Sequence, residues 1–365
     1  MTFSRFDHEC MATALRLARR GLFTTDPNPR VGCVIAGGKR VAGTGWHEKA
    51  GGPHAEIAAL REAGESARGK TAYVTLEPCS YHGRTPPCTD ALLEAGIKRV
   101  VVAAKDPNPQ VNGNGLQRLR SAGVEVETGL MADEAEMLNA GFIMRMKQGR
   151  PWVRIKSAIS LDGKTALHNG ESKWISSAAS RLDVQRWRAR SSAILTGVGT
   201  VLADDPSMDA RVDQAVQQPL RVVADSCWRT PAGSRILAGP GTTLIAGDLS
   251  VPIPDALASS DVQCLRLPAS GGALDLRALM KALAEMEINE VQVEAGARLC
   301  GALFRDQLVD ELLIYQAPLL LGEGGPGPFA FGPLESMTES THLELLETSH
   351  FGDDLRIRLQ PKFRR

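Results

Sequence analysis

Three residues of the types that bind zinc lie near one another in the first quarter of the chain, beside a carboxylate. His54 begins a His-Ala-Glu motif, and Cys79 and Cys88 flank a loop of eight residues. A structural zinc usually has four protein ligands, whereas one His and two Cys leave the fourth position for water. Glu56 is then available to move the protons of that water. The pattern predicts a zinc-dependent hydrolytic deaminase site, with this Glu as general acid and base.

The loop between the two cysteines is longer than the C-x-x-C spacing of many zinc deaminases. It runs from Ser80 to Pro87 and carries a further imidazole, His82. A fourth protein ligand would displace the water on which Glu56 acts, so we expect His82 to contact the substrate or to brace the loop. The extra length can form one side of a substrate pocket and narrow the choice of substrate.

The first half of the chain alternates between helical and strand patterns, which predicts an α/β layered domain. The expected helices and strands before the Asp106 loop are helix 7–20, strand 31–36, helix 54–63, strand 72–76, helix 88–94 and strand 99–104. After residue 115 we expect a helix, a strand over 124–127 and a helix over 133–147. Cys88 would then begin a helix, where the helix dipole lowers the pKa of a thiol.

A Gly-Arg-Pro stretch at 149–151 predicts a boundary between two domains, residues 1–149 and 150–365. A helix is expected over 178–190. The expected strands of the second half are 152–159, 193–197, 220–224, 243–246, 291–294, 311–316 and 354–359. This pattern predicts a mixed sheet flanked by helices.

The overall composition argues against several classes of partner. Forty-two basic residues balance forty-two acidic residues, and no basic block stands out, so nucleic acid is not an expected partner. No apolar stretch is long enough to span a membrane, and the amino terminus has no signal-peptide pattern. Seven cysteines are an odd number, and two already have a metal role, so we expect a reducing cytoplasm and no disulfide framework.

A second candidate site lies in the other half of the chain. At Glu294-Ala295-Gly296 a strand pattern gives way to a short helix, and free N–H groups at a helix start favour phosphate. The pattern alone is weak, because it lacks the lysine of a P-loop, and Gly296 could simply end a strand. Lys156 and Glu294 are candidates for proton transfer during reduction of a sugar carbonyl, or they form a buried salt bridge.

Three further residues of this half each allow a functional and a structural interpretation. Arg188 and Arg211 suit a ribose phosphate, yet a surface arginine is usually just solvated. Trp174 could line a cofactor site or belong to the core.

Long motifs extend along the whole chain. They are N-P-R-V-G-C-V from Asn28, E-P-C-S-x-H-G-R-T-P-P-C from Glu77, D-P-N-P from Asp106, and, in the second half, K-S-A-I-S-L-D-G-K-T-A, G-E-S-K-W-I-S, T-V-L-A-D-D-P and V-E-A-G. With these motifs the chain closely resembles the bifunctional pyrimidine deaminase/reductases of riboflavin biosynthesis. Two departures, Tyr81 for a common His and Arg30 for a common Asn, affect details of substrate contact.

The resemblance implies two consecutive reactions in two domains. A cytidine-deaminase-like three-layer domain would deaminate a diaminopyrimidinone ribosylamine phosphate, and a mixed-sheet domain similar to dihydrofolate reductase would reduce the ribosyl group to ribityl with NADPH. It implies zinc on His54, Cys79 and Cys88, proton transfer by Glu56 and recognition of the pyrimidine by Asn28. We also expect a homo-oligomer, either a dimer or a tetramer.

The resemblance also assigns residues of the reductase half. Cofactor contacts fall on Ala158, Trp174, Thr200, Asp204, Ser226, Gly296, Ala297, Arg298, Leu299, Cys300, Gly301 and Ala302. Substrate contacts fall on Ser172, Arg188, Met208, Arg211 and Glu294.

Two alternatives remain open at this point. One is a nucleoside or tRNA deaminase with an unrelated carboxy-terminal module. The other is a protein without enzymatic activity in which zinc serves only as a scaffold.

Overall fold

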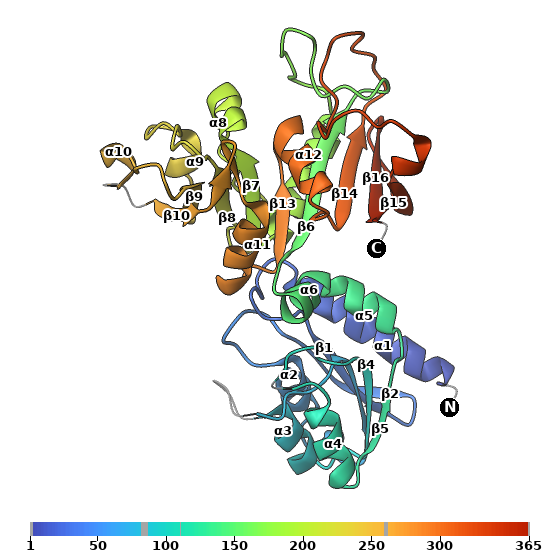
Figure 1. The fold of residues 1–365 in the computed structure, drawn as a ribbon. Coiled ribbons are helices and arrows are strands. Elements are labelled where there is room, and N and C mark those ends of the chain that lie inside the picture. The colour runs from blue at the N-terminus through green and yellow to red at the C-terminus, as the bar shows by residue number, and fades with distance from the viewer. Residues whose placement is uncertain (1–2, 82–86, 110, 259–261, 364–365) are drawn as a thin grey trace. The chain divides into compact units, whose positions relative to one another are not determined.

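The computed structural model describes residues 3–81, 87–109, 111–258 and 262–363 (Figure 1). The chain divides into two compact units between Gly149 and Arg150, within the Gly-Arg-Pro stretch. Among the described helices, none has the length and apolar character needed to cross a membrane.

The first unit contains one five-stranded sheet and its helices. Its strands are β1 (Gly32–Gly37), β2 (Arg40–Trp46), β3 (Thr71–Leu76), β4 (Arg99–Ala104) and β5 (Glu125–Thr128). Its helices are α1 (Arg5–Ala18), α2 (Ala55–Ala63), α3 (Cys88–Glu94), α4 (Asn114–Ser121), α5 (Ala132–Leu138) and α6 (Ala140–Gln148), with short 3-10 turns at Arg19–Gly21 and Gly64–Ala67.

The sheet has the order β2-β1-β3-β4-β5 and is covered by helices on both faces. Strands β3, β4 and β5 are parallel, and β1 is antiparallel to both of its neighbours. One face packs against α1, α5 and α6, and the other against α2, α3 and α4. Strands β3 and β4 are apolar runs, as expected of parallel strands buried on both faces. The three-layer α/β prediction is confirmed.

Strand β2 was not predicted from the sequence, because Gly43 and Gly45 weaken its strand pattern. These glycines have a packing role. A Cβ atom on Gly45 would lie 2.3 Å from the carbonyl oxygen of Ala55, and one on Gly43 would lie 2.3 Å from that of Ala59. Helix α2 therefore rests directly on the backbone of β2, and its first turn carries part of the predicted metal site.

The single helix predicted over 133–147 is wrong, because Asn139 divides it into α5 and α6. The Asn139 side chain bonds both backbone groups of Arg30: its Oδ1 accepts from the Arg30 N–H at 2.8 Å, and its Nδ2 donates to the Arg30 carbonyl at 2.9 Å. The Arg30 guanidinium donates to the Leu138 carbonyl at 3.2 Å and is buried. Arg30, which stands where a related chain commonly has Asn, therefore stabilises the junction between α5 and α6.

The second unit is built on a nine-stranded sheet. The strands are β6 (Trp152–Ile159), β7 (Ala193–Gly197), β8 (Leu220–Ala224), β9 (Thr243–Asp248), β10 (Gln263–Leu267), β13 (Glu290–Val293), β14 (Glu311–Gln316), β15 (His342–Phe351) and β16 (Asp354–Lys362), with a small hairpin of β11 (Ala269–Ser270) and β12 (Ala273–Leu274). The helices are α7 (Ala178–Arg190), α8 (Val198–Asp204), α9 (Arg235–Ala238), α10 (Asp255–Ala258), α11 (Leu276–Glu285) and α12 (Ala297–Arg305), with a 3-10 turn at Met337–Glu339.

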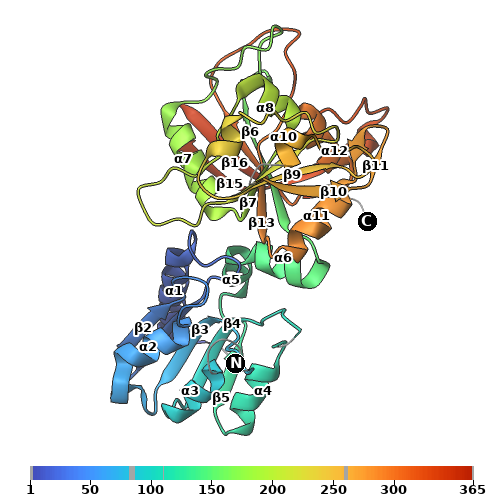
Figure 2. The ribbon, with the colours of Figure 1, turned by 90° about the vertical axis from the view of Figure 1, so that its left-hand side faces the viewer.

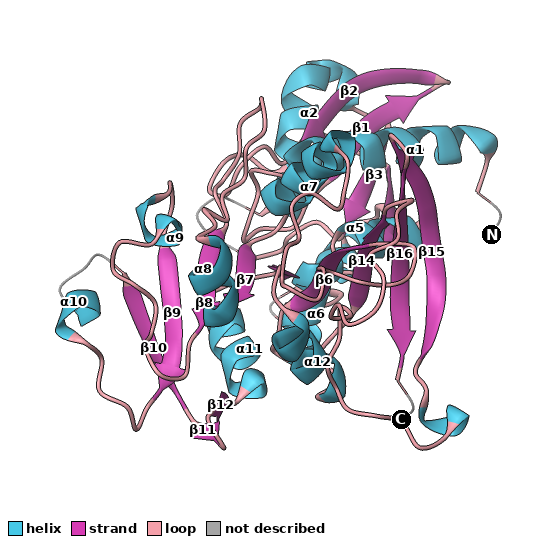
Figure 3. Cartoon of the chain, turned by 90° about the horizontal axis from the view of Figure 1, so that it is seen from above, coloured by secondary structure: helices cyan, strands magenta, loops and turns pink. Residues whose placement is uncertain are grey.

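The strand order is β10-β9-β8-β7-β13-β6-β14-β16-β15, which can be followed in Figure 1. Figures 2 and 3 show the same sheet from two other sides. From β10 to β14 all neighbours are parallel, and the β15–β16 hairpin joins antiparallel to β14. Helices α11 and α12 pack on one face, and α7 to α10 on the other. The predicted mixed sheet flanked by helices is confirmed, although β9 and β16 run further than expected and β10 and β15 were not predicted.

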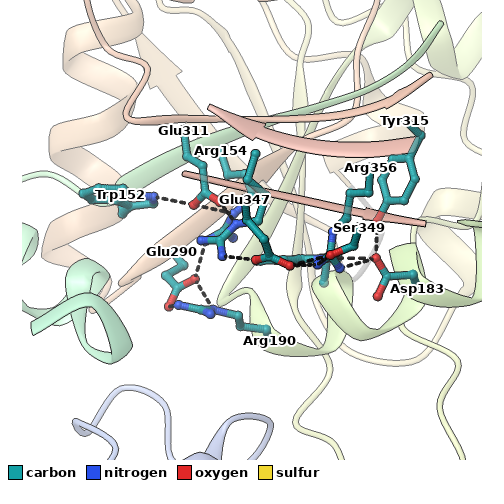
Figure 4. Close-up of polar contacts among 12 residues, drawn as sticks. Trp152, Arg154, Asp183, Arg190, Glu290, Glu311, Tyr315, Glu347, Ser349 and Arg356 are labelled. Carbon is teal, nitrogen blue, oxygen red and sulfur yellow. Dashed lines mark hydrogen bonds and ion pairs between the residues drawn. The ribbon is translucent and has the colours of Figure 1, made fainter. Parts of the chain in front are cut away.

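Helix α7 meets the sheet through charged side chains (Figure 4). Its Trp187 lies among the guanidinium groups of four arginines, 154, 190, 356 and 358, at 4.5 to 5.7 Å from the ring centroid. The four arginines form ion pairs of 2.5 to 3.2 Å with four carboxylates, those of Asp183, Glu290, Glu311 and Glu347. We refer to these nine residues as the α7 network.

Candidate active sites

The three predicted metal ligands come together in the first unit. The ligand atoms of His54, Cys79 and Cys88 all lie within 4.8 Å of one another. His54 Nδ1 is 3.1 Å from the Cys88 sulfur and 3.6 Å from the Cys79 sulfur. Around a tetrahedral zinc with bonds of about 2.0 to 2.3 Å, ligand atoms lie roughly 3.5 Å apart. The donor types and their separations therefore fit zinc.

Each ligand is placed by the end of a secondary-structure element. His54 is the N-cap residue of α2, so this helix begins one residue later than predicted. Cys88 is the first residue of α3, as predicted, and Cys79 follows β3 in a loop. The Cys88 backbone N–H donates to the Cys79 sulfur at 3.3 Å, and the Thr89 N–H donates to the Cys79 carbonyl at 3.2 Å. The start of α3 thus holds the Cys79 loop.

The two thiols differ in acidity. The hydrogen bond from Cys88 and the adjacent His54 together lower the pKa of Cys79 to about 4, although burial opposes this change. The pKa of Cys88 is raised, first by its interaction with Cys79 and then by burial. The prediction that the helix start lowers the pKa of Cys88 is therefore wrong for this arrangement, because a neighbouring thiolate and burial outweigh the dipole.

Glu56 lies in the first turn of α2 with only 3% of its surface exposed. Burial raises its pKa, and the positive charge of His54 opposes that rise. The carboxyl also hydrogen-bonds the Cys88 thiol, which places it against the ligand cluster. A buried carboxyl group with a raised pKa beside a metal site has the properties of a proton carrier.

The predicted pyrimidine contact Asn28 is held by His47, a residue that the sequence did not single out. His47 Nδ1 lies 3.0 Å from the Pro53 carbonyl oxygen, so this nitrogen carries the proton. Its Nε2 then accepts from Asn28 Nδ2 at 3.0 Å. Burial lowers the pKa of His47, which keeps the ring neutral in this role. His47 is a single histidine after the unpredicted strand β2, so no sequence motif pointed to its role.

The loop between the cysteines is described only at its ends. Tyr81 is 38% exposed, and the partial burial of its hydroxyl group raises its pKa. The predicted role of His82 lies outside the described residues.

In the second unit, Glu294 and Arg188 form a bidentate ion pair. Arg188 Nε and Nη2 donate to the two carboxylate oxygens at 2.7 and 2.9 Å, and both side chains are about nine-tenths buried. The same guanidinium contacts the sulfur of Met208 at 3.6 Å. Gln292 also donates to Glu294, at 2.8 Å. Arg188 is therefore neither free nor simply solvated.

Lys156 lies near this pair without being its direct partner. Burial lowers its pKa, and the nearby Glu294 opposes that change. Its Nζ is 6.0 Å from the ring centroid of Tyr315. The alternative of a buried salt bridge is borne out for Glu294, whose ion-pair partner is Arg188.

Five of the twelve predicted cofactor residues lie at one edge of the second sheet or on the helix that follows it. The parallel strands β8, β7, β13 and β6 are adjacent, and their carboxyl ends share an edge. Ala158, Ser226 and Gly296 lie at or just after these ends, and Thr200 and Asp204 lie on α8, which follows β7 directly. Gly296 is the N-cap of α12, so the expected strand-to-helix junction is confirmed. Ligands of open α/β sheets bind at such an edge.

Helix α12 contains six further predicted cofactor positions, 297–302. Cys300 is buried with its thiol donating to the Ala295 carbonyl at 3.3 Å, and a Cβ on Gly301 would lie 2.2 Å from the Ala330 carbonyl oxygen. These two residues face the core. Phosphate binding by the backbone N–H groups of the first turn stays a prediction.

The remaining predicted residues lie on the surface. Trp174 is 69% exposed, so the alternative that it belongs to the core is wrong, and its ring stacks 4.6 Å from the Arg181 guanidinium. Arg211 is exposed and pairs with Asp209 at 2.5 Å. Ser172 is partly buried, and its role remains a prediction, as do those of Trp174 and Arg211.

Comparison with known proteins matches both units. Residues 4–104 match the family of the cytidine and deoxycytidylate deaminase zinc-binding region, and residues 151–357 match the RibD C-terminal domain. The riboflavin biosynthesis protein RibD of Escherichia coli is 48% identical over 97% of this chain and 99% of its own length. The RibD protein of Haemophilus influenzae is 44% identical over 99% of both.

Solved structures agree over the full chain. Acinetobacter baumannii RibD superposes with a TM-score of 0.92 at 45% identity, covering 98% of this chain and 99% of that one. A deaminase/reductase from Thermotoga maritima, named for a diaminohydroxyphosphoribosylaminopyrimidine and for 5-amino-6-(5-phosphoribosylamino)uracil, gives 0.88 at 32% identity with the same coverage.

A deaminase zinc-binding region and a reductase domain in one chain define a bifunctional deaminase/reductase. The chain belongs to the RibD family of riboflavin biosynthesis proteins. The alternative of an unrelated carboxy-terminal module is therefore wrong, and so is that of a zinc scaffold without enzymatic activity.

Proposed function

We propose that the chain catalyses two consecutive steps of riboflavin biosynthesis. The first unit hydrolytically deaminates 2,5-diamino-6-(5-phosphoribosylamino)pyrimidin-4-one to 5-amino-6-(5-phosphoribosylamino)uracil. The second unit reduces the ribosyl group of that product to ribityl with NADPH. The observation that carries the proposal is the cluster of His54, Cys79 and Cys88 against the buried carboxyl of Glu56.

In the deaminase site, residues of the chain would hold the zinc, bind the substrate and transfer protons. His54, Cys79 and Cys88 would hold zinc, which when bound supplies the Lewis acidity that lets water react near neutral pH. Glu56 takes one proton from water and passes it to the ring nitrogen, and then moves the second proton of the same water to the amino group, which leaves as ammonia. Asn28 donates through Nδ2 to His47, so its Oδ1 is oriented to accept from an N–H of the pyrimidine.

In the reductase site, NADPH supplies a hydride, and the chain's residues orient the reactants. The edge of β6, β7, β8 and β13 supports cofactor contacts at Ala158, Thr200, Asp204, Ser226 and Gly296. Lys156, whose pKa burial lowers, protonates the oxygen or nitrogen that develops negative charge. Glu294 keeps Arg188 in place for the substrate, so its part is to orient rather than to transfer a proton.

We also infer a cytoplasmic homo-oligomer. All seven cysteines are free thiols, and two of them must stay reduced to bind zinc. Light scattering of the purified protein measures its mass, and a monomer at all concentrations would rule out the dimer and the tetramer.

A coupled assay of the intact protein tests the proposed reactions. Ammonia release and NADPH oxidation are followed together after addition of the diaminopyrimidinone phosphate, with cytidine and an adenosine-containing tRNA in parallel reactions. We expect ammonia first and NADPH oxidation second, with the phosphate substrate only. Turnover confined to cytidine or to the tRNA would disprove the proposed substrate.

A further inference from the structure

The residue before the Pro-Cys motif is a buried carboxylate that binds a distant loop. Glu77 is 3% exposed. Its Oε2 accepts from the backbone N–H groups of Gly113 at 3.0 Å and Asp106 at 3.4 Å. Its Oε1 accepts from those of Gly115 at 3.0 Å and Leu116 at 3.3 Å. One side chain therefore gathers four N–H groups from a segment about thirty residues further along the chain.

Three of these N–H groups belong to the start of helix α4. The N-cap residue, Gly113, has a left-handed backbone with φ of 94° and provides no side-chain cap. The first N–H groups of a helix need acceptors from outside, and the dipole favours a negative charge there. Glu77, the residue directly after β3, meets both needs, so it caps α4 in place of a residue of the helix itself.

The start of α4 also packs closely against Pro78, the residue before the predicted metal ligand Cys79. A Cβ atom on Gly115 would lie 2.1 Å from the Pro78 carbonyl oxygen, so only glycine fits there. Cys79 is the next residue after Pro78. The position of α4 and that of the Cys79 backbone are consequently linked by direct contact.

The same carboxylate holds the Asp-Pro-Asn-Pro loop beside the site. The Asp106 N–H binds Glu77, and the Asp106 carboxylate accepts from the Asn108 N–H at 2.8 Å. Asp106 is 8% exposed and lies close enough to Cys79 for their charges to interact. Glu77 thus joins two segments that border the metal site.

We propose that Glu77 is a positioning residue for deamination. Its carboxylate fixes the start of α4 and the Asp106 loop against the Pro78–Cys79 peptide, and so holds the Cys79 ligand in its place. A carboxylate suits four N–H donors because both of its oxygens only accept. The effect on turnover rests on the proposed deaminase function, whereas the effect on zinc does not.

The test compares Glu77→Gln with Glu62→Gln in the full-length protein. The Glu62 carboxylate also accepts from a backbone N–H, that of Thr44 at 2.7 Å, but lies on the exposed far end of α2. Three quantities are measured: zinc retained against a competing chelator, kcat and KM for ammonia release, and NADPH oxidation with supplied deaminated substrate. The last is a control for folding of the same chain.

In Glu77→Gln the amide NH₂ faces N–H donors, so we expect zinc affinity and the deaminase kcat to fall roughly 10- to 100-fold, with reduction unchanged. Glu62→Gln should change none of these more than about twofold. Gly115→Ala, which keeps the carboxylate and displaces α4, should reproduce the loss.

Zinc affinity and kcat within twofold of the wild type in both Glu77→Gln and Gly115→Ala would overturn the proposal. So would a lower melting temperature as the sole effect, because that outcome assigns Glu77 a purely structural role. Zinc binding is measured without substrate, so it judges Glu77 even if the wild-type protein deaminates another pyrimidine.

Discussion

Glu56 is the residue whose chemistry separates a deaminase from a protein that only binds zinc. It is buried beside the three ligands and is not one of them. We expect Glu56→Gln to lower deamination by roughly 10²- to 10⁴-fold, because general acid and base catalysis contributes about that much. Zinc content should stay at the wild-type level, and reduction of supplied deaminated substrate should be unchanged. Loss of zinc together with activity would instead make Glu56 part of the metal-binding set.

The Glu294–Arg188 pair predicts a dependence of stability on pH. Burial alone would raise the pKa of Glu294, but the charge of Arg188 prevails and lowers it from 4.5 to about 2. A lowered folded-state pKa contributes stability that is present above about pH 4.5 and is lost as pH falls toward 2. The urea midpoint of the second unit should therefore exceed that of Glu294→Gln at neutral pH, and the difference should shrink below pH 4.5. An equal difference at pH 7 and pH 3 would contradict this assignment.

At the scale of elements, α7 shows how a helix without an apolar stripe is held on a sheet. In the α7 network, Glu290 pairs with Arg154 at 3.2 Å and with Arg190 at 2.9 Å, and Glu290 and Arg154 are almost fully buried. Four positive charges balance four negative charges in this layer, so removal of any one leaves the layer with a net charge. Because Arg188 belongs to the same helix, the network also sets the position of the arginine that binds Glu294.

We expect Glu290→Gln to destabilise the second unit by about 3 to 5 kcal/mol, the usual cost of breaking a buried ion pair. The control is Glu344→Gln, which breaks the exposed pair with Lys362 at 3.0 Å and should cost less than about 1 kcal/mol. Urea unfolding followed by tryptophan fluorescence measures both. Similar values for the two variants would show that the α7 network contributes no more than a surface pair.

Element positions were predicted well wherever periodicity was local. The runs at β3, β4 and β14 are apolar and bounded by turns, so their place in the sequence was clear. Strand β2 was missed because its two glycines serve the packing of α2, and the division between α5 and α6 was missed because Asn139 bonds Arg30, 109 residues away. In both cases the deciding contact is tertiary.

At the scale of the molecule, zinc belongs to one unit and reduction to the other. The three ligands lie within residues 1–149, and the carboxyl-end edge of the second sheet lies within 150–365. Removing zinc with a chelator should therefore abolish ammonia release and leave NADPH oxidation with supplied deaminated substrate within about twofold of its starting rate. Readdition of zinc should restore deamination. Loss of both activities on chelation would show that the second unit depends on the metal.

The sequence by itself determined the zinc chemistry, the boundary stretch and the α/β character of both halves. His54, Cys79 and Cys88 are recognisable because metal ligation depends on residue type and on short spacing next to helix starts, and Glu56 is recognisable by its place two residues after His54. Only the tertiary structure decided that Arg188 pairs with Glu294, that His47 orients Asn28 and that Glu77 caps α4. These partners are 19 to 106 residues apart, and their meeting depends on sheet order and on the direction of each side chain, which local pattern does not encode.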